Sequence, residues 1–345
     1  MHILGGGSLG SLFASHFAKT VPTTMLLRPE AARLAGLHCT ISVTEEDSDM
    51  VDTQTLPCEP ADGTVRDPFD ILVVAVKAFD ARSALEAVGA RVAESSTVIL
   101  MCNGALAVAD DLPHLGGASL LCATTTHGAW SRGPRDLHHA GKGHTWIGAL
   151  PKAGTAPSGG GVSRERGNIC EAPLPPHAAG AQELFASRGL GAVVEGPADT
   201  ERRLWLKLAA NAVLNPMTAL WSCENGQVLT RHEGRAAAQQ VCEEVQAVCQ
   251  QLAVSQAAAG LSVSDLVGFV HACAAANARN LSSMCVDVRS GRRTEIEQLN
   301  GWIVKRGRAI AQARGMDAAS AEWMGKNGEL ADAVRKRHPA CAVKE

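Results

Sequence analysis

A lysine and two asparagines recur at four-residue intervals in the otherwise apolar segment 206–226, which reads LKLAANAVLNPMTALWSCENG. An α-helix turns by about 100° per residue, so Lys207, Asn211 and Asn215 would form one stripe on a helix. Burying such a stripe costs free energy unless polar atoms meet it. A small oxygen-rich ligand would supply those atoms, and so would a polar network between two helices. Pro216 is expected to kink the helix just beyond the stripe.

A glycine-rich turn stands near the start of the chain. Residues 2–4 suit a short strand, and residues 11–18 place Phe13 and Phe17 four apart, as a helix does. Between them lies a GxGxxG motif, formed by Gly5, Gly6, Gly7, Ser8, Leu9 and Gly10. In a strand–turn–helix context this motif lets backbone N–H groups approach the pyrophosphate of a dinucleotide. The alternative is a glycine-rich turn without a ligand.

The second predicted strand, residues 23–27, ends at Arg28. NAD enzymes usually place a carboxylate here for the ribose 2′-hydroxyl, whereas a guanidinium suits a 2′-phosphate. Arg28 therefore favours NADP(H) as the cofactor. Two alternatives stay open. Either the carboxylate of Glu30 binds the ribose 2′-hydroxyl, or Arg28 is a solvated surface residue.

Composition excludes several classes of protein. The 345 residues suffice for two domains, and a net charge of −3 predicts no attraction to nucleic acid or anionic membranes. No apolar run is long enough to span a bilayer, and we expect no targeting peptide ahead of the first strand. The eleven cysteines form no CxxC pair, which indicates reduced thiols and a cytoplasmic location. Tyrosine is absent, so a Tyr–Lys proton-relay reductase is excluded.

The first half of the chain alternates between strand and helix patterns. Three near-continuous apolar runs, typical of strands buried on both faces of a parallel sheet, lie at residues 70–77, 96–103 and 119–126. Crossover helices are predicted at 81–92 and 105–112. Lys77 and Asn103 close two of the strands, and α/β sheets bind ligands at such carboxyl ends. Each of the two is alternatively an ordinary polar loop residue.

Three histidines raise the question of a metal site. His138, His139 and His144 lie within segment 135–150, which is typical of a hairpin. A hairpin would not make the three converge, and no carboxylate or thiol cluster lies at ligand spacing. We therefore predict no metal.

The second half is almost purely helical. Helices are predicted at 181–187, 200–222, 231–253, 264–278 and 294–314. Residues 151–179 are rich in Gly, Pro and Ser and are interpreted as a flexible linker or insertion. The predicted organisation is an α/β dinucleotide-binding domain (1–150), this linker, a helical substrate domain (180–335) and a charged tail (336–345).

Two further polar residues are placed by helix starts. Thr294 and Glu297 form a capping box, which would begin the last long helix there and put Glu295 in its first turn. Ser283 would act as an N-cap before Met284. Both placements also have a purely structural explanation.

Seven blocks together resemble the ketopantoate reductase (2-dehydropantoate 2-reductase) family. They occur in the family's order and cover nearly the whole chain: GGGSLG (5–10), Arg28, VK (76–77), NG (103–104), TTTHGA (124–129), WLKLAANAVLNPMTALWSCENG (205–226) and SSMCVDVRSGRRTEIEQLNG (282–301). The resemblance implies a Rossmann domain followed by an all-α domain like that of 6-phosphogluconate dehydrogenase. It also implies NADPH-dependent reduction of ketopantoate to pantoate, a step toward pantothenate and coenzyme A. Because helical second domains of this type often pair, a homodimer is expected.

The resemblance also implies a role for each site residue. Lys207 would be the general acid that protonates the ketone oxygen. Asn211, Asn215, Asn225 and Ser283 would hold the substrate's carboxylate and hydroxyls, and Asn103 would touch both substrate and cofactor. Ala129 would lie beside the cofactor, and Glu295 would contact it and help to orient Lys207. The glycine turn, Arg28 and Lys77 would bind NADPH; Asn225 is alternatively part of a simple Asn-Gly turn.

There are three alternatives to this function. The first is a reductase of another branched 2-oxo acid, since asparagines do not define the substrate's alkyl shape. The second is a catalytically silent NADP-binding module, which would be expected to have lost the lysine or the polar stripe. The third is a helical interaction protein with an unrelated glycine turn, which fails to explain Arg28, Lys77 and Asn103.

Overall fold

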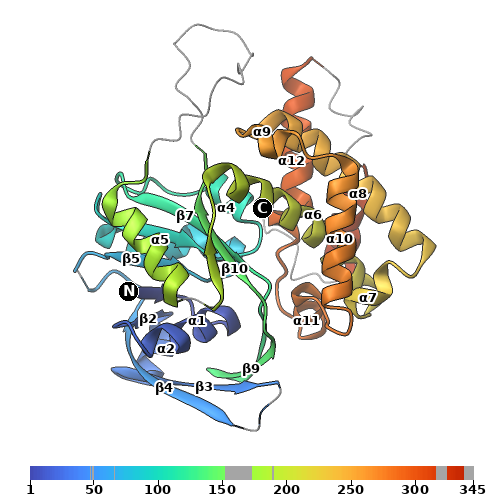
Figure 1. Cartoon of the computed structure of the whole chain (residues 1–345). Coiled ribbons are helices and arrows are strands. Elements are labelled where there is room, and N and C mark those ends of the chain that lie inside the picture. Colours follow the sequence, from blue (N-terminus) through green and yellow to red (C-terminus); the bar gives the residue numbers. More distant parts are fainter. Residues whose placement is uncertain are drawn as a thin grey trace, which may run out of the picture. The chain divides into compact units, whose positions relative to one another are not determined.

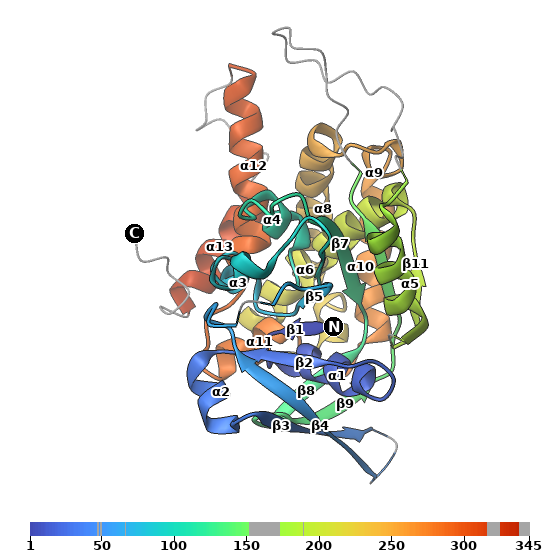
Figure 2. The same cartoon turned by 90° about the vertical axis from the view of Figure 1, so that its left-hand side faces the viewer.

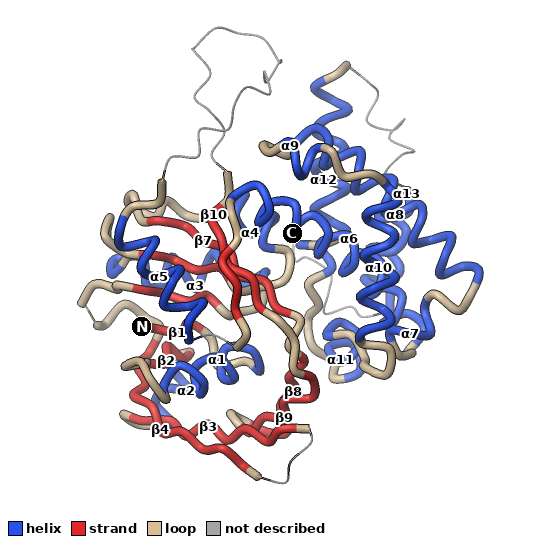
Figure 3. Tube along the Cα trace, in the orientation of Figure 1, coloured by secondary structure: helices blue, strands red, loops and turns tan. Residues whose placement is uncertain are grey.

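The computed structural model describes residues 1–46, 48, 50–65, 67–151, 173–188, 190–315 and 325–337. The chain divides into two compact units. Among the described residues, the sheet unit comprises 1–150 and 173–200, and the helical unit comprises 201–315 and 325–337. Strands (red in Figure 3) belong to the sheet unit, while the described part of the helical unit is built of helices. None of the described helices is both long and apolar enough to cross a bilayer.

The sheet unit (Figure 1) is built on one mixed sheet. Within the described residues its strand order is β11-β10-β7-β6-β5-β1-β2-β4-β3-β9-β8. Six adjacent strands, from β7 to β4, are parallel. The strands are β1 (His2–Leu4), β2 (Thr24–Leu27), β3 (His38–Glu45), β4 (Val51–Pro60), β5 (Ile71–Val74), β6 (Thr97–Leu100), β7 (Ser119–Thr125), β8 (Gly128–Gly133), β9 (Asp136–Gly141), β10 (Thr145–Ala149) and β11 (Ala192–Val194).

The predicted parallel strands are confirmed as β1, β2, β5, β6 and β7, and the flanking strands are additional. The hairpin predicted over 135–150 is wrong. β9 pairs with β3 and β8, whereas β10 pairs with β7 and β11. Each strand therefore finds its partners elsewhere in the sheet, which a pattern of local alternation cannot specify.

A row of apolar side chains in register forms the centre of the core. Met25, Ile3, Val73, Ile99 and Leu121 lie directly opposite one another across five strands, and all are buried. Residues paired across strands point to the same face, so this row presents one continuous apolar surface. The near-continuous hydrophobicity of the strands reflects burial of both faces.

Helices α1 (Ser8–Ala18) and α5 (Pro176–Arg188) meet over that core. The ring of Phe185 stacks on Phe13 with centroids 5.8 Å apart and contacts Phe17 at 5.2 Å. α1 also packs against β3, β4 and β9, which lie near it in Figure 2. The other helices of the unit are α2 (Pro29–Ala35), η1 (Ala78–Asp80), α3 (Ala81–Val88), η2 (Gly89–Arg91) and α4 (Ala105–Asp110).

The domain boundary lies about twenty residues later than predicted. We expected helical structure from residue 180 to mark the second domain, but α5 covers the sheet and β11 extends it by pairing in parallel with β10. The sheet unit therefore ends at Thr200. Of the predicted 151–179 linker, residues 152–172 lie outside the described residues, and α5 begins at Pro176. In the predicted tail, Lys336 and Arg337 are helical and residues 338–345 are not described.

The helical unit contains the predicted long helices together with several shorter ones. They are α6 (Pro197–Trp221), which begins at the boundary, α7 (Asn225–Val228), α8 (His232–Leu252), α9 (Gln256–Ala259), α10 (Val263–Ala276), α11 (Ser283–Arg289), η3 (Ile296–Gln298), α12 (Asn300–Ala313) and α13 (Gly325–Arg337). The start of the last long helix predicted at Thr294 is wrong. The short helix η3 intervenes, and α12 begins only at Asn300.

Helix α6 continues through Pro216 because another residue replaces the missing hydrogen-bond donor. Proline has no N–H, so the Ala212 carbonyl four residues earlier loses its helical partner. The side-chain amide of Asn300 donates to that oxygen at 2.9 Å and also to Oδ1 of Asn327 at 2.9 Å. Asn300 and Asn327 are both fully buried, so these bonds form away from water.

The same network caps α13. The carboxylate of Glu244 on α8 accepts hydrogen bonds from the backbone N–H groups of Lys326 and Asn327, at 2.7 and 2.9 Å. It also accepts from the Asn327 side-chain amide at 2.6 Å. Burial raises the pKa of Glu244, and the bonds from Asn327 oppose that shift. One chain of polar contacts thus joins α6, α12, α13 and α8.

Replacing Asn300 should show that it compensates for Pro216. Asn300→Leu leaves the Ala212 carbonyl buried without a donor, and we expect the free energy of unfolding to fall by about 1–3 kcal/mol. Pro216→Ala supplies a backbone N–H to the same oxygen. In urea titrations, Pro216→Ala should therefore stabilise the Asn300→Leu protein more than it stabilises the wild type. Additive effects in this double-mutant cycle would contradict the coupling.

Candidate active site

The glycine turn, Arg28, Lys77 and Asn103 all follow the carboxyl ends of neighbouring parallel strands. The order β6-β5-β1-β2 places the turn after β1, with Arg28 after β2, Lys77 after β5 and Asn103 after β6. The chain changes direction across the sheet between β1 and β5. Such a switch point is where α/β sheets bind dinucleotides.

The glycines are required by the close approach of β1, α1 and β5. Gly5 has φ +117°, and a Cβ there would lie 2.6 Å from the Ala75 carbonyl oxygen. A Cβ on Gly10 would collide with the Gly5 carbonyl oxygen, whereas one on Gly7 would meet nothing within 4 Å. α1 begins at Ser8, three residues earlier than predicted, so Ser8 and Leu9 lie in its first turn. The first N–H groups of a helix have no intrahelical partners, so the start of α1 suits an anion.

Arg28 forms an ion pair that the sequence did not predict. Its guanidinium donates to Oδ2 of Asp80 at 2.8 Å, and its side chain is 84% exposed. Asp80 ends η1, just beyond β5, so the pair links the ends of β2 and β5. At this exposure the pair contributes at most about 1 kcal/mol to stability. In the sequence, the acidic residue Asp80 shortly after Lys77 was the signal that could have predicted this ion pair.

Ala129 lies on β8, directly opposite His139 of β9. Its side chain packs against the core of the sheet unit. Asn103 is half-buried and precedes Gly104, whose φ of +63° turns the chain into α4. Lys77 is half-buried before η1. The predicted positions of Lys77 and Asn103 at the ends of strands are confirmed. The roles of Ala129, Asn103 and Lys77 remain predictions.

In the helical unit, Lys207, Asn211 and Asn215 lie on consecutive turns of α6, as the spacing predicted. Asn211 and Asn215 are buried, and Lys207 is half-buried. Burial lowers the pKa of the Lys207 ammonium, and the Cys273 thiol on α10 opposes that shift. Among the described residues, no carboxylate forms an ion pair with Lys207. The stripe therefore combines an easily deprotonated ammonium with two neutral amides.

Thr218 ties the end of this stripe to α11. Its hydroxyl donates to the Leu214 carbonyl at 2.7 Å and lies 2.6 Å from the Ser282 hydroxyl. Ser282 is the N-cap of α11, because its Oγ accepts from the Cys285 N–H. The N-cap predicted at Ser283 is thus wrong by one residue. Ser283 is the first residue of α11. It directly follows Ser282, whose hydroxyl contacts that of Thr218, three residues after Asn215.

Asn225 is the first residue of α7 rather than part of a simple turn. Its N–H donates to the Asn280 carbonyl at 2.9 Å and its side-chain amide to the Asn277 carbonyl at 3.2 Å. The side-chain Oδ1 is buried and has no partner among the described residues. A buried acceptor without a donor is costly, so this oxygen is suited to a ligand hydroxyl.

Glu295 is buried and precedes η3, so it is not in the first turn of α12 as expected. The histidines of segment 135–150 point to different surroundings, with His138 and His139 on opposite faces of β9. Within the described ranges, no group of three or more metal-ligating side chains converges.

A doubly wound dinucleotide-binding sheet, followed by helices that carry a lysine–asparagine stripe, defines a two-domain nicotinamide-dependent oxidoreductase. Comparison with family models narrows this class. The model of "Ketopantoate reductase PanE/ApbA" matches residues 1–152, and that of "Ketopantoate reductase PanE/ApbA C terminal" matches residues 199–318. The chain belongs to the ketopantoate reductase family.

Individual relatives agree over most of the length. The 2-dehydropantoate 2-reductase of Halobacterium salinarum is 31% identical over 308 residues, covering 89% of this chain and 91% of that protein. A PanE/ApbA family ketopantoate reductase from Ralstonia eutropha has the same fold, with a TM-score of 0.72, 23% identity and coverage of 98% and 99%.

Two further solved structures share the fold. One is D-mandelate dehydrogenase with NADH and anilino(oxo)acetate, at a TM-score of 0.76, 16% identity and coverage of 99% and 100%. The other is a dimeric ketopantoate reductase from Staphylococcus aureus, at a TM-score of 0.69, 18% identity and coverage of 99% of each chain.

Two glycine variants should separate packing from cofactor binding. Gly10→Ala places a methyl group against the Gly5 carbonyl, so we expect a lower melting temperature in the apo protein. Gly7→Ala meets no protein atom within 4 Å, and its melting temperature should be unchanged. Because the second glycine lets the backbone approach a pyrophosphate, Gly7→Ala should weaken NADPH binding about tenfold or more. Unchanged NADPH affinity, measured by fluorescence titration, would argue against this site.

Proposed function

We propose that this protein reduces 2-dehydropantoate (ketopantoate) to (R)-pantoate with NADPH, as part of pantothenate and coenzyme A synthesis. The observation that carries the proposal is the α6 stripe, in which an ammonium with a lowered pKa shares a helix face with two buried asparagines. The family membership and the glycine turn at the β1–α1 connection support it. The 2-oxo acid and the nicotinamide cofactor are the two reactants.

The residues of the sheet unit fit a phosphorylated dinucleotide. The α1 N-terminus and the open position at Gly7 would accept the pyrophosphate. Arg28 would pair with a 2′-phosphate, for which a guanidinium is better suited than a carboxylate. Lys77, Asn103 and Ala129 would complete the cofactor site. When bound, NADPH supplies the hydride for the ketone carbon.

Lys207 would act as the general acid. Hydride addition to a ketone builds negative charge on its oxygen, which a nearby ammonium stabilises and protonates. Burial lowers the pKa of Lys207, which makes proton release easier. Glu295 would help to orient this ammonium and contact the cofactor.

The neutral amides would hold the substrate without adding charge. Each asparagine offers two donors and an acceptor, so one set can bind a carboxylate and hydroxyl groups. We assign this role to Asn211, Asn215, Asn225 and Ser283, with Asn103 contacting both substrate and cofactor. The unpartnered Oδ1 of Asn225 supports its assignment to a hydroxyl.

A second candidate is reduction of another branched 2-oxo acid. The likeness in fold to D-mandelate dehydrogenase, solved with NADH and anilino(oxo)acetate, favours keeping this alternative. Comparing turnover on ketopantoate and 2-oxoisovalerate separates the two. A silent NADP-binding module is not favoured, because the ammonium and the amides of the stripe are all present on α6.

We also infer a cytoplasmic homodimer. The nine described cysteines are all free thiols, as expected in a reducing compartment. The dimeric reductase from Staphylococcus aureus with the same fold supports pairing. Sedimentation of the purified protein tests the oligomeric state.

Loss of the acid should remove turnover but not cofactor binding. Lys207→Ala should lower kcat with NADPH and ketopantoate by about 10²–10⁴-fold, the usual contribution of a positioned acid. The Kd for NADPH should stay within about twofold. Lys207→Arg is the matched control: it keeps the charge but holds its proton too tightly to donate it. Wild-type kcat in Lys207→Ala, followed as loss of NADPH absorbance, would reject this mechanism.

The pH dependence should report the same group. A general acid must be protonated, so kcat should be constant at low pH and fall as pH rises through the Lys207 pKa. Because burial lowers that pKa, the fall should come below the usual lysine range. Lys207→Ala should lose this limb of the profile. A wild-type profile that is flat to the ordinary lysine range would contradict the assignment.

Arg28 should determine the choice of cofactor. Removing a charge-assisted hydrogen bond costs about 1.5–3 kcal/mol. Arg28→Ala should therefore raise the Kd for NADPH about ten- to a hundredfold and leave the Kd for NADH nearly unchanged. Arg33→Ala, an exposed arginine on α2, serves as the control. If Glu30→Ala weakens NADH binding while Arg28→Ala changes neither Kd, Glu30 is the ribose reader instead.

A further inference from the structure

Two histidines and a glutamate form a hydrogen-bonded chain in the sheet unit that the proposed reaction does not use. His139 Nδ1 lies 3.1 Å from Oε1 of Glu45, and its Nε2 lies 2.9 Å from Nδ1 of His127. Nε2 of His127 lies 2.9 Å from the Leu190 carbonyl oxygen. His139 is only 2% exposed. The chain of partly buried hydrogen bonds therefore runs from β3 to Leu190, two residues before β11.

The partners of His127 fix its protonation state. A carbonyl oxygen only accepts, so Nε2 of His127 carries a proton and donates it to Leu190. The backbone N–H of Gly143 donates to Nδ1 of His127 at 3.1 Å, so that nitrogen is unprotonated. His127 is therefore neutral. Burial is the largest cause that lowers its pKa, and the neighbouring His139, His144 and His16 lower it further.

The partners of His139 then require two protons on its ring. Nε2 faces the unprotonated Nδ1 of His127 and must donate to it. Nδ1 faces the Glu45 carboxylate, which only accepts, so it must donate as well. Although burial raises the pKa of Glu45, hydrogen bonds and charge from His139 and Lys142 hold it below its usual value. The hydrogen-bond pattern thus stores one positive charge on buried His139, paired with Glu45.

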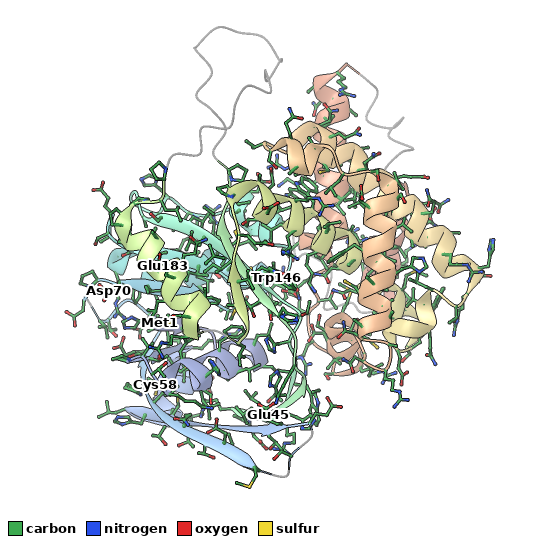
Figure 4. The ribbon with its side chains drawn as sticks, viewed as in Figure 1. Met1, Glu45, Cys58, Asp70, Trp146 and Glu183 are labelled. Atoms are coloured by element: carbon green, nitrogen blue, oxygen red, sulfur yellow. The ribbon has the colours of Figure 1, made fainter. Side chains whose placement is uncertain are left out.

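The strand register connects this charge to the predicted cofactor site. Glu45 of β3, labelled in Figure 4, lies directly opposite His139 of β9, which lies directly opposite Ala129 of β8. A β-bulge between Gly128 and Ala129 interrupts the β8–β9 ladder. The His127–His139 bond spans this irregularity. Removing the charge would leave the bulge without its side-chain bond.

We propose that Glu45, His139 and His127 are positioning residues that fix segment 127–129, and with it Ala129, by holding one proton on His139. This inference rests on the proposed role of Ala129 beside NADPH. The other ionisable groups around the chain are Lys142, His144 and His16. Of these, Lys142 contacts Glu45 at 3.5 Å and is exposed. Loss of the His139–His127 hydrogen bond would loosen the segment and weaken NADPH binding.

Nitrogen-15 NMR of the histidine rings tests the proton directly. In the full-length protein at pH 7, both ring nitrogens of His139 should have the shifts of protonated nitrogens. His127 should show one protonated nitrogen, Nε2, and one bare nitrogen. In the Glu45→Gln protein, which lacks the charge paired with His139, the backbone amide signal of Ala129 should shift. A bare nitrogen on His139 at pH 7, or an Ala129 amide signal that Glu45→Gln leaves unchanged, would overturn the proposal.

Variants test the link to the cofactor. Glu45→Gln keeps the side-chain shape but removes the charge that is paired with His139, so segment 127–129 should be held less firmly. We expect NADPH to bind about five- to tenfold more weakly than in the wild type. His138→Gln, on the opposite face of β9, is the control and should bind NADPH normally. Wild-type NADPH affinity in the Glu45→Gln protein would count against the proposal.

These readouts are independent of turnover. If the protein fails to reduce ketopantoate, the NMR shifts and the NADPH affinities still decide whether His139 holds the proton and fixes the segment. If Glu45→Gln does not fold, the ring-nitrogen shifts of His139 and His127 in the wild type decide alone. Failure of this positioning role and failure of the proposed reaction are therefore distinguishable.

Discussion

The helical unit depends on the hydrogen bond that Pro216 cannot make. Because proline has no N–H, the Ala212 carbonyl has no helical donor in the middle of a buried helix. The side-chain amide of Asn300 donates to it instead, at 2.9 Å. Because α6 therefore continues past the proline, Lys207, Asn211 and Asn215 keep the regular spacing that puts them on one stripe. The same asparagine leads through Asn327 to the capping of α13 by Glu244 on α8. The helix that carries the polar stripe is thus stabilised by a second, structural polar network.

The two polar networks differ in whether their charge is paired within the protein. Around Asn300 the amide donors and the Glu244 carboxylate meet inside the protein, although Oδ1 of Asn300 has no donor among the described residues. On α6, by contrast, burial lowers the pKa of Lys207, and no described carboxylate forms an ion pair with it. Desolvating a charged group without a partner is costly in a purely structural element. This cost is the physical reason for assigning ligand binding to the stripe and stability to the network around Asn300.

In the sheet unit, strand register brings polar residues from distant parts of the chain together. One apolar row, from Met25 to Leu121, sets the alignment of five parallel strands, and their carboxyl ends bring the glycine turn, Arg28, Lys77 and Asn103 to one edge. On the outer strands the register instead aligns Glu45, His139 and Ala129. There a buried charge is stabilised by a carboxylate and a neutral imidazole rather than by water. The β8–β9 bulge, between Gly128 and Ala129, lies beside His139.

The sequence by itself determined the parallel strands, the glycine turn, the long helices and the Lys207–Asn211–Asn215 stripe, because each follows from a local period or a fixed spacing. Only the tertiary structure decided the rest. β11 joins the sheet through partners 47 residues earlier, as Ala192 pairs with Thr145, which moved the domain boundary to Thr200. Asp80 reaches Arg28, Asn300 reaches Ala212 and His139 reaches Glu45 across long stretches of chain. Even the N-cap at Ser282 and the start of α12 at Asn300 differed from prediction, since a helix begins where packing and available acceptors allow it. Such contacts depend on which distant atoms are brought together, and no short sequence pattern encodes that.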